Sequence, residues 1–266
     1  MRGPRLRETH HRRYFVPPER VRNGWVEFTP GQAHQMIHVL RLRSGDRVSI
    51  FDGTGREVMA SLKVATPRRV KARLLEELPL LPSPRVRVAL AQVVPRGPAM
   101  DLIVAKATEL GVDRIFPLEG ERSVRRACVD RSGRWLRIVQ EAAEQCGRRD
   151  LPKIAHTRTL EAFLLSHPRE TPLVACDVSR ESQPLMAACR ELRGAHSLVF
   201  LVGGEGGLSP TELMCLRSHG ARLASLGPWL LRAETAALAA LAIAQAALRD
   251  WEIGPDGEIG GRSSSG

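Results

Sequence analysis

Residues 198–212 read LVFLVGGEGGLSPTE, an apolar run followed by a glycine-rich turn and the start of a helix. Residues 222–237 repeat this order as RLASLGPWLLRAETAA. Each stretch predicts a buried strand that leads through a loop into a helix, which is where open α/β sheets bind their ligands. The glycines among residues 203–207 leave room for a ligand directly on the backbone. The pair of loops therefore predicts a binding site for a flat, polar cofactor.

The first loop does not match the common phosphate-binding motifs. After Gly204 and Gly206, the dinucleotide pattern G-x-G-x-x-G requires a glycine where Ser209 stands, and the chain contains no Gly-Lys-Ser/Thr of a P-loop. An ordinary connection from strand to helix is the alternative, with Ser209 as the N-cap and Glu212 completing a capping box. Such capping explains only the end of the loop. It does not explain the glycine run, for which we favour a binding function.

The first 80 residues or so have a different pattern of short, partly alternating strands. The expected strands are residues 25–28, 47–53 and 57–64, with turn signals at 44–46 and 52–55 and a short helix over 31–39. Strands of this length between such turns predict a small barrel of antiparallel strands.

A proline-punctuated segment at 78–84 predicts a domain boundary, and beyond it strands alternate with helices. The expected strands are 85–94, 113–118, 172–176, 197–202 and 222–226, and the expected helices are 99–110, 131–146 and 234–251. Alternation of this kind predicts a mostly parallel sheet with helices on both faces. We expect domains over residues 1–78 and 84–252, followed by a disordered tail over 253–266 that is rich in glycine and serine.

Further motifs accompany the two loops in a fixed order. They are RYFV at 13–16, HVLRLRSGD at 38–46, FDG at 51–53, KATELGV at 106–112, ERS at 121–123 and EAAEQCGR at 141–148. Together with the loops they resemble the bacterial ribosomal RNA uridine N3-methyltransferases, members of the S-adenosylmethionine-dependent SPOUT superfamily, over about residues 12–250. The resemblance implies a trefoil-knotted α/β methyltransferase domain preceded by a PUA-like, RNA-binding β-barrel, a homodimer, and methylation of a uridine in small-subunit ribosomal RNA. The chain departs from the family at Gly204, where proline is usual.

The resemblance assigns S-adenosylmethionine to the two loops. The residues expected to hold it are Leu201, Val202, Gly203, Gly204, Glu205, Gly206, Gly207, Leu226, Gly227, Leu230, Leu231 and Ala236. Methylation at N3 of uridine requires removal of a proton, because the protonated imide nitrogen is a poor nucleophile. Glu205 is a candidate base, with binding of backbone N–H groups as its alternative role. Arg232 is a candidate for stabilising negative charge on the uracil, with an ion pair to Glu234 as the alternative.

The chain is strongly basic, with a formal net charge of +11 that comes almost wholly from arginine. A GC-rich genome also favours arginine over lysine, but the sign of the charge favours a polyanionic partner. The candidate RNA contacts are Arg12, Arg13, Arg41, Arg43, Arg122, Gln145 and Arg148. Around Arg148 the alternative is an exposed helix face with an ion pair to Glu144. The expected partner is small-subunit ribosomal RNA or the assembled small subunit.

The composition argues against several other classes of protein. No apolar segment approaches the ~18 residues of a membrane span, and the basic N-terminus lacks the apolar core of a secretion signal, so a cytoplasmic protein is expected. The five cysteines are widely spaced without a C-x-x-C motif, which predicts reduced thiols and no metal site. Two rival functions remain open: methylation of a ribose 2′-hydroxyl, and a ribosome assembly factor that keeps the fold without turnover.

Overall fold

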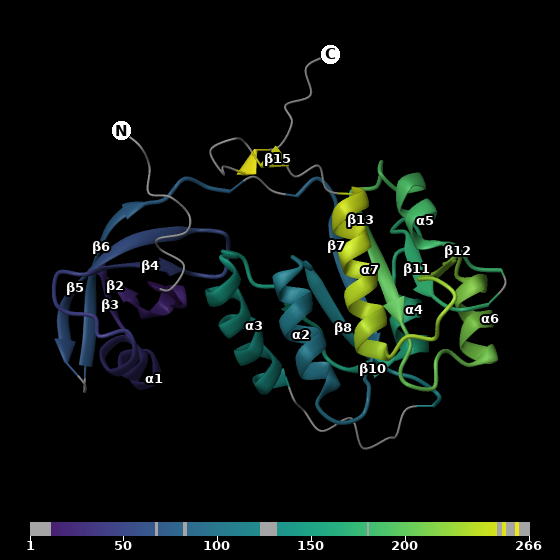
Figure 1. The fold of residues 1–266 in the computed structure, drawn as a ribbon, viewed down its shortest axis with the longest axis horizontal. Coiled ribbons are helices and arrows are strands. Elements are labelled where there is room, and N and C mark those ends of the chain that lie inside the picture. The colour runs from purple at the N-terminus through teal and green to yellow at the C-terminus, as the bar shows by residue number, and fades with distance from the viewer. Residues whose placement is uncertain are drawn as a thin grey trace, which may run out of the picture. The chain divides into compact units, whose positions relative to one another are not determined.

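The computed structural model describes residues 12–66, 69–81, 84–122, 132–179 and 181–248, and the backbone of 252–253 and 259–260. The chain divides into two compact units (Figure 1). The N-terminal unit contains Met1–Pro82, Gln140–Leu151 and Ile253–Gly260, and the sheet unit contains Ser83–Val139, Pro152–Glu252 and Gly261–Gly266. Most of the tail expected over 253–266 lies outside the described residues, which here include only the short strands β15 (Glu252–Ile253) and β16 (Ile259–Gly260).

The N-terminal unit is built on a six-stranded sheet with the order β1-β4-β5-β6-β3-β2. Its strands are β1 (Arg13–Phe15), β2 (Val21–Arg22), β3 (Trp25–Glu27), β4 (Arg47–Phe51), β5 (Glu57–Thr66) and β6 (Arg69–Glu77). Neighbouring strands are antiparallel, except that β1 runs parallel to β4. The predicted strands β3, β4 and β5 are confirmed, whereas the charged strand β6 was not predicted.

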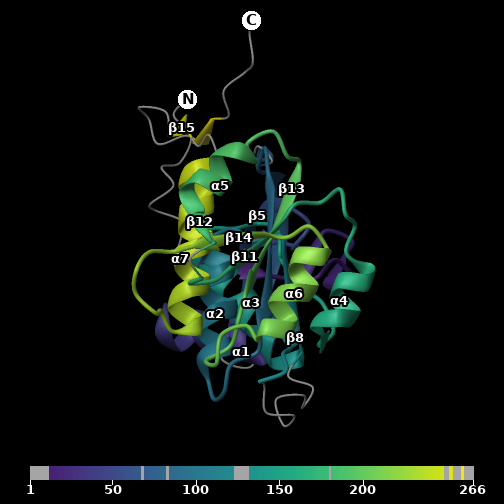
Figure 2. The same ribbon diagram turned by 90° about the vertical axis from the view of Figure 1, so that its right-hand side faces the viewer.

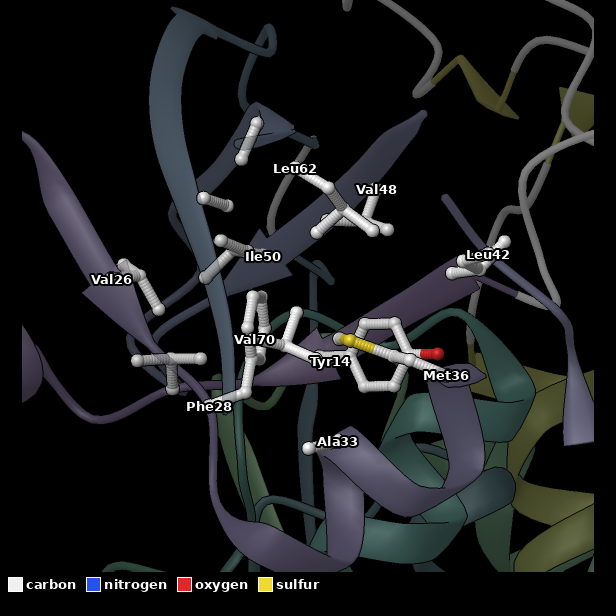
Figure 3. Packing of buried hydrophobic residues seen from close by; sticks show 13 residues of the cluster. Tyr14, Val26, Phe28, Ala33, Met36, Leu42, Val48, Ile50, Leu62 and Val70 are labelled. Atoms are coloured by element: carbon white, nitrogen blue, oxygen red, sulfur yellow. The ribbon is translucent and has the colours of Figure 1, made fainter. Parts of the chain in front are cut away.

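The core of the N-terminal unit lies between this sheet and a short helical segment (Figure 3). The segment consists of α1 (Pro30–His34) and the π-helical turn η3 (Gln35–Val39), which together confirm the helix predicted over 31–39. Met36 is fully buried and belongs to one cluster with Tyr14 and Phe28, whose rings meet edge to face at 5.6 Å. Burial of these side chains holds the helix against the strands.

The sheet unit contains an eight-stranded sheet with the order β10-β8-β7-β13-β11-β14-β12, in which β9 also pairs with β8. The strands are β7 (Arg87–Val93), β8 (Arg114–Glu119), β9 (Lys153–Ile154), β10 (Arg158–Thr159), β11 (Leu173–Cys176), β12 (Gln183–Pro184), β13 (Ser197–Val202) and β14 (Arg222–Ser225). Every pairing between them is parallel, which confirms the predicted type of sheet. The central strand β13 is apolar along most of its length, as expected for a strand that is covered on both faces.

Helices cover both faces of the parallel sheet (Figure 2). They are α2 (Ala99–Glu109), α4 (Leu160–Ser166), α5 (Leu185–Glu191), α6 (Pro210–Ser218) and α7 (Ala233–Leu248), whereas α3 (Ser132–Cys146) is shared between the two units. One face carries α2, α5 and α7, and the other carries α4 and α6. Ala237, Ala240 and Ala244 of α7 are fully buried, so these small residues let α7 pack closely within the chain. No helix in the described part of the chain is both long and apolar enough to cross a membrane.

Two of these helices are each followed by a glycine. Gly111 follows α2 and Gly147 follows α3, with φ angles of +74° and +87°. Only glycine adopts this left-handed conformation without strain, so each helix stops at a position fixed by the sequence. The chain first passes between the units after Pro82, within the segment predicted as a domain boundary, and it passes again inside α3, after Val139.

Candidate functional site

A pocket opens at the carboxyl ends of three neighbouring strands of the parallel sheet, β11, β13 and β14. Its empty volume is about 580 Å³, part of which is open to solvent. Three loops and the start of α7 line it: residues 176–178, residues 202–208 except Gly206, residues 226 and 229–231, and Ala233 and Ala236. Both loops singled out in the sequence therefore meet at one pocket, on the edge of the sheet where α/β proteins bind ligands.

Most residues expected to hold the cofactor line this pocket. Those that do are Val202, Gly203, Gly204, Glu205, Gly207, Leu226, Leu230, Leu231 and Ala236. Leu201, Gly206 and Gly227 belong to the same strand ends and loops but are not among the lining residues.

The loop after β13 depends on glycine at two positions. A Cβ at Gly203 would lie 3.0 Å from the carbonyl carbon of Gly207, so close that the backbone would have to shift. Gly207 has a φ of +66° and donates its N–H to the carbonyl of Gly204 at 3.0 Å. At Gly204, a Cβ would instead make an ordinary contact with Cγ1 of Val93 at 3.4 Å. The shape of the turn thus requires glycine at 203 and 207, and not at 204.

Ser209 ends this loop and caps α6. Its hydroxyl accepts the N–H of Glu212 at 3.0 Å, and the Glu212 carboxylate accepts the N–H of Ser209 at 2.7 Å, which confirms the predicted capping box. Glu212 is only 5% exposed, and its second oxygen accepts the N–H of Glu121 at 2.9 Å. The capping carboxylate therefore also ties the loop to the segment after β8.

Gln92, in β7, supports the loop from within the sheet. Its side chain is fully buried, and its amide nitrogen donates to the carbonyls of Val93 at 2.9 Å and Gly203 at 3.1 Å. Sequence reasoning did not select this residue. The available signal was that Gln92 is the one polar side chain in the apolar run 88–94.

Glu205 and Arg122 fasten the tip of the loop. The Glu205 carboxylate accepts the N–H of Arg96 at 2.6 Å, so the backbone-binding role weighed for Glu205 is present in the structure. Nη1 of Arg122 donates to the carbonyl of Gly206 at 2.7 Å. Arg122, expected to contact RNA, therefore lies directly beside the candidate cofactor loop.

The loop after β14 forms an apolar wall of the pocket. Gly227 has a φ of +127°, and its N–H donates to the Ser225 hydroxyl at 3.2 Å. Trp229 and Leu230 are 77% and 82% exposed although both line the pocket. Arg232 follows this wall and is exposed, and its side chain makes no hydrogen bond or ion pair, including to Glu234, within the part of the chain that the structure describes.

The loop after β11 completes the pocket and was not predicted. Burial raises the pKa of the Cys176 thiol to about 12, so this thiol stays protonated at neutral pH and is no nucleophile. The next residue, Asp177, donates its N–H to the carbonyl of Ala224 at 2.9 Å, and its Oδ2 accepts the N–H of Ser179 at 3.0 Å. The sequence signal was an acidic residue directly after a buried strand.

These groups fit S-adenosylmethionine. The exposed side chains of Trp229 and Leu230 offer an apolar surface for a flat ring. The turn at Gly203 and Gly207 brings backbone groups to the pocket without side chains in between. Asp177 supplies a carboxylate for a cationic group.

Four of the predicted RNA contacts lie at the surface of the N-terminal unit, where phosphate could reach them. They are Arg12, Arg41, Arg43 and Gln145. Arg41 also has a φ of +53°, a conformation that is strained for a residue other than glycine.

Arg13 and Arg148 have internal contacts instead. Arg13 is 6% exposed, and its guanidinium donates to Glu57 at 2.8 Å and to the carbonyl of Ala143 at 3.1 Å. A guanidinium committed in this way is not available to a phosphate, so the expectation that Arg13 contacts RNA is corrected to a structural role. The Arg148 side chain is 10% exposed and pairs with Asp150 at 2.7 Å.

Within the described ranges, no group of three or more His, Cys, Asp or Glu side chains could hold a metal ion. Cys146, Cys176, Cys189 and Cys215 form no disulfide within the described ranges, and Cys128 lies outside them.

Comparison with known proteins gives matches over both units. Residues 82–245 match a family described as an RNA methyltransferase domain, and residues 28–75 match an RNA methyltransferase PUA domain. The chain is 34% identical over 234 residues to the Ribosomal RNA small subunit methyltransferase E of Synechocystis, covering 86% of this chain and 76% of that protein. It is 28% identical over 230 residues to the protein of the same name in Bacillus subtilis, covering 80% of this chain and 86% of the relative.

Two solved structures have the same fold with a bound cofactor. The Ribosomal RNA small subunit methyltransferase E of Neisseria gonorrhoeae, bound to S-adenosylmethionine, superposes with a TM-score of 0.81 at 30% identity, covering 90% of this chain and 99% of that one. A Legionella pneumophila protein described as a putative methyltransferase, in complex with the same cofactor, has a TM-score of 0.77 at 28% identity, covering 89% of this chain and 97% of that one.

Proposed function

The chain belongs to the RNA methyltransferase family, and from this membership we propose that it transfers a methyl group from S-adenosylmethionine to N3 of a uridine in small-subunit ribosomal RNA. The observation that supports this most directly is the pocket at the carboxyl ends of β11, β13 and β14, lined by both loops that the family resemblance assigns to the cofactor. The relatives that carry S-adenosylmethionine share the fold of this chain at TM-scores of 0.81 and 0.77.

The cofactor, when bound, supplies an electrophilic methyl group on a sulfonium sulfur. The backbone of Gly203 and Gly207, with the apolar wall around Leu230, holds and orients it in the pocket. Gln92 and Arg122 fix the carbonyls of Gly203 and Gly206, so the loop is preorganised before binding. Positioning of this kind provides much of the rate of a transfer between two bound reactants.

The uracil must lose its N3 proton before it can accept a methyl group. We assign Arg232 to the stabilisation of the resulting negative charge on the uracil oxygens, because its exposed guanidinium follows the pocket wall. Glu205 lines the pocket and is the carboxylate proposed to accept the proton. One of its oxygens is held by the N–H of Arg96, which fixes the direction of the other.

Arginines of both units are proposed to bind the RNA backbone. They are Arg12, Arg41 and Arg43 in the N-terminal unit and Arg122 beside the cofactor loop, with Gln145 as a further contact. A homodimer is proposed on the strength of the family resemblance and of the exposed apolar side chains Trp229 and Leu230. The same resemblance supports a trefoil knot around the cofactor loops and action in the cytoplasm. The domains proposed over residues 1–78 and 84–252 rest on the proline-punctuated segment at 78–84, although Gln140–Leu151 packs with the N-terminal unit.

The test uses small ribosomal subunits from a Bacillus subtilis strain that lacks its own methyltransferase E. Purified protein and S-adenosylmethionine with an isotope-labelled methyl group are added to the subunits or to free ribosomal RNA. The RNA is then digested and its nucleosides are identified by mass spectrometry. The expected product is labelled N3-methyluridine, and the two substrates separate action on the assembled subunit from action on free RNA.

The rival functions predict other outcomes. Labelled 2′-O-methyl nucleosides without N3-methyluridine would identify a ribose methyltransferase. Cofactor binding without any labelled nucleoside would identify an assembly factor. The variant Arg232→Ala serves as the control for chemistry, because it should lose the product while the cofactor still binds.

A further inference from the structure

The charges that line the pocket are opposite in sign to the charge of the whole protein. Asp177 and Glu205 are the charged side chains among its lining residues, and both are acidic. The chain as a whole has a formal net charge of +11. A basic protein whose cofactor pocket is lined by two acidic residues is arranged to favour a cationic ligand there.

Asp177 is the better placed of the two carboxylates. Its backbone N–H is bound to Ala224, and its Oδ2 accepts the N–H of Ser179 at 3.0 Å, so the side chain is held at the end of β11. Its Oδ1 has no hydrogen-bond partner within the described ranges. Glu205 is exposed and one of its oxygens already binds Arg96, so water and salt screen its charge more strongly.

We propose that the Asp177 carboxylate makes the pocket select the cationic methyl donor over its product, which has no net charge. This rests on the proposed function. S-adenosylmethionine carries a sulfonium, an ammonium and a carboxylate, and so has one net positive charge. S-adenosylhomocysteine has lost the sulfonium charge and is neutral overall. A fixed carboxylate beside the ligand attracts the first and has little net attraction for the second.

Such selection has a consequence for turnover. Transfer of the methyl group removes the positive charge that Asp177 attracts, so the product is held less tightly than the donor it came from. Asp177 is thus a specificity-determining residue, which acts through the charge of the ligand and takes no part in moving the proton or the methyl group.

The variant Asp177→Asn tests the charge and preserves the local structure. Asparagine keeps an oxygen that can accept the N–H of Ser179, so the turn at the end of β11 is retained. Dissociation constants for S-adenosylmethionine and S-adenosylhomocysteine are measured by titration calorimetry on the full chain without RNA. We expect the affinity for S-adenosylmethionine to fall roughly tenfold, while the affinity for S-adenosylhomocysteine changes by less than about twofold.

Glu181→Gln provides the matched control. Glu181 lies in the same loop, pairs with Arg217, and does not line the pocket, so removing its charge should leave both affinities unchanged. Equal losses for both ligands in Asp177→Asn, or no loss for either, would overturn the proposal. Failure of the unmodified protein to bind either ligand would instead overturn the proposed function.

The salt dependence of ligand binding by the unmodified protein provides a second test. Because salt screens charge interactions, raising the ionic strength should lower the preference for S-adenosylmethionine over S-adenosylhomocysteine. A preference that does not change with salt would also overturn the proposal.

Discussion

Arg13 and Glu57 form a buried ion pair in the N-terminal unit, with Nε 2.8 Å from Oε1 and each side chain 4% exposed. Ser49 and Arg149 bind the same carboxylate. The Arg13 guanidinium also donates to the carbonyl of Ala143, near the end of α3. These contacts join the first described strand to a segment 130 residues further along, which explains why Gln140–Leu151 belongs to the N-terminal unit.

Replacing Arg13 by alanine should unfold this unit at lower denaturant concentration. The change leaves the Glu57 carboxylate buried with fewer partners, and breaking a buried pair from one side costs about 3–5 kcal/mol. Urea unfolding followed by circular dichroism measures the loss. Arg12→Ala is the control, since Arg12 is exposed and its removal should change the free energy of unfolding by less than about 0.5 kcal/mol. Equal effects of the two substitutions would contradict a structural role for Arg13.

Because of the Glu57 carboxyl, the free energy of unfolding should decrease at acidic pH. Burial raises the pKa of Glu57, but the hydrogen bond and charge of Arg13, with Ser49 and Arg149, lower it by more, so the pKa lies below its ordinary value. A carboxyl with a lowered pKa in the folded state contributes stability that is fully present above its unfolded pKa and is lost as pH falls through the folded pKa. The stability difference between the unmodified protein and Glu57→Gln should therefore be constant above about pH 5 and shrink below about pH 4.

Glu144 should show the opposite dependence on pH. Burial raises the pKa of its carboxyl, although hydrogen bonds from Phe15 and Gln32 act against this. A carboxyl whose pKa is raised in the folded state contributes stability that is present below its unfolded pKa. This stability is lost as the pH rises through the folded pKa. Glu144→Gln keeps an acceptor for the Phe15 N–H, so it should gain stability relative to the unmodified protein as pH rises from about 4 to 7. Urea unfolding at a series of pH values measures both variants, and parallel changes in the two would refute these assignments.

The sequence predicts the elements whose patterns are long or chemically distinct. The strands and helices of the parallel sheet alternate along the sequence, and the two glycine-bearing loops predict the pocket. The strands β9, β10 and β12 have two residues each, too few to show a period. The helices α4 and α5 have seven residues each and were missed for the same reason.

Residues whose roles depend on distant partners were not predictable. Arg13 reads as one more arginine in a basic chain, because its partners Glu57 and Ala143 are 44 and 130 residues away. Asp177 and Gln92 join the site only because parallel pairing brings β7 and β11 on either side of β13. Pairing between strands that are far apart in the sequence is a tertiary property with no local signal.

The exposed arginines of the N-terminal unit should set the salt dependence of RNA binding. Each phosphate contact releases counterions, so losing one should reduce the slope of log affinity against log salt by about 0.7–0.9. Arg41→Gln and Arg43→Gln should each have this effect in filter binding to small-subunit ribosomal RNA. Arg69→Gln is the control, because Arg69 already pairs with Glu27 at 2.7 Å. A slope that is unchanged in the first two variants would exclude these arginines from the RNA interface.

The two adjacent glycines at the start of the cofactor loop should respond differently to alanine. Gly203→Ala places a Cβ 3.0 Å from the backbone of Gly207, and such crowding costs about 1–3 kcal/mol. Gly204→Ala meets only the Val93 side chain at 3.4 Å and should be tolerated. Calorimetric titration with S-adenosylmethionine should therefore show weakened binding in the first variant and near-normal binding in the second. Equal binding by both variants would mean that the loop shifts at no cost.

Gln92 should contribute both to the stability of the parallel sheet and to cofactor binding by the loop after β13. Gln92→Met keeps the approximate length of the side chain but removes the donor to the carbonyls of Val93 and Gly203. A buried carbonyl without a partner costs about 1–3 kcal/mol, so the variant should unfold more easily and bind S-adenosylmethionine more weakly. Leu90→Met is the control, because it changes the shape of a fully buried side chain in the same strand without removing a hydrogen bond. Loss of stability with unchanged cofactor affinity would show that Gln92 supports the sheet alone and does not position the loop.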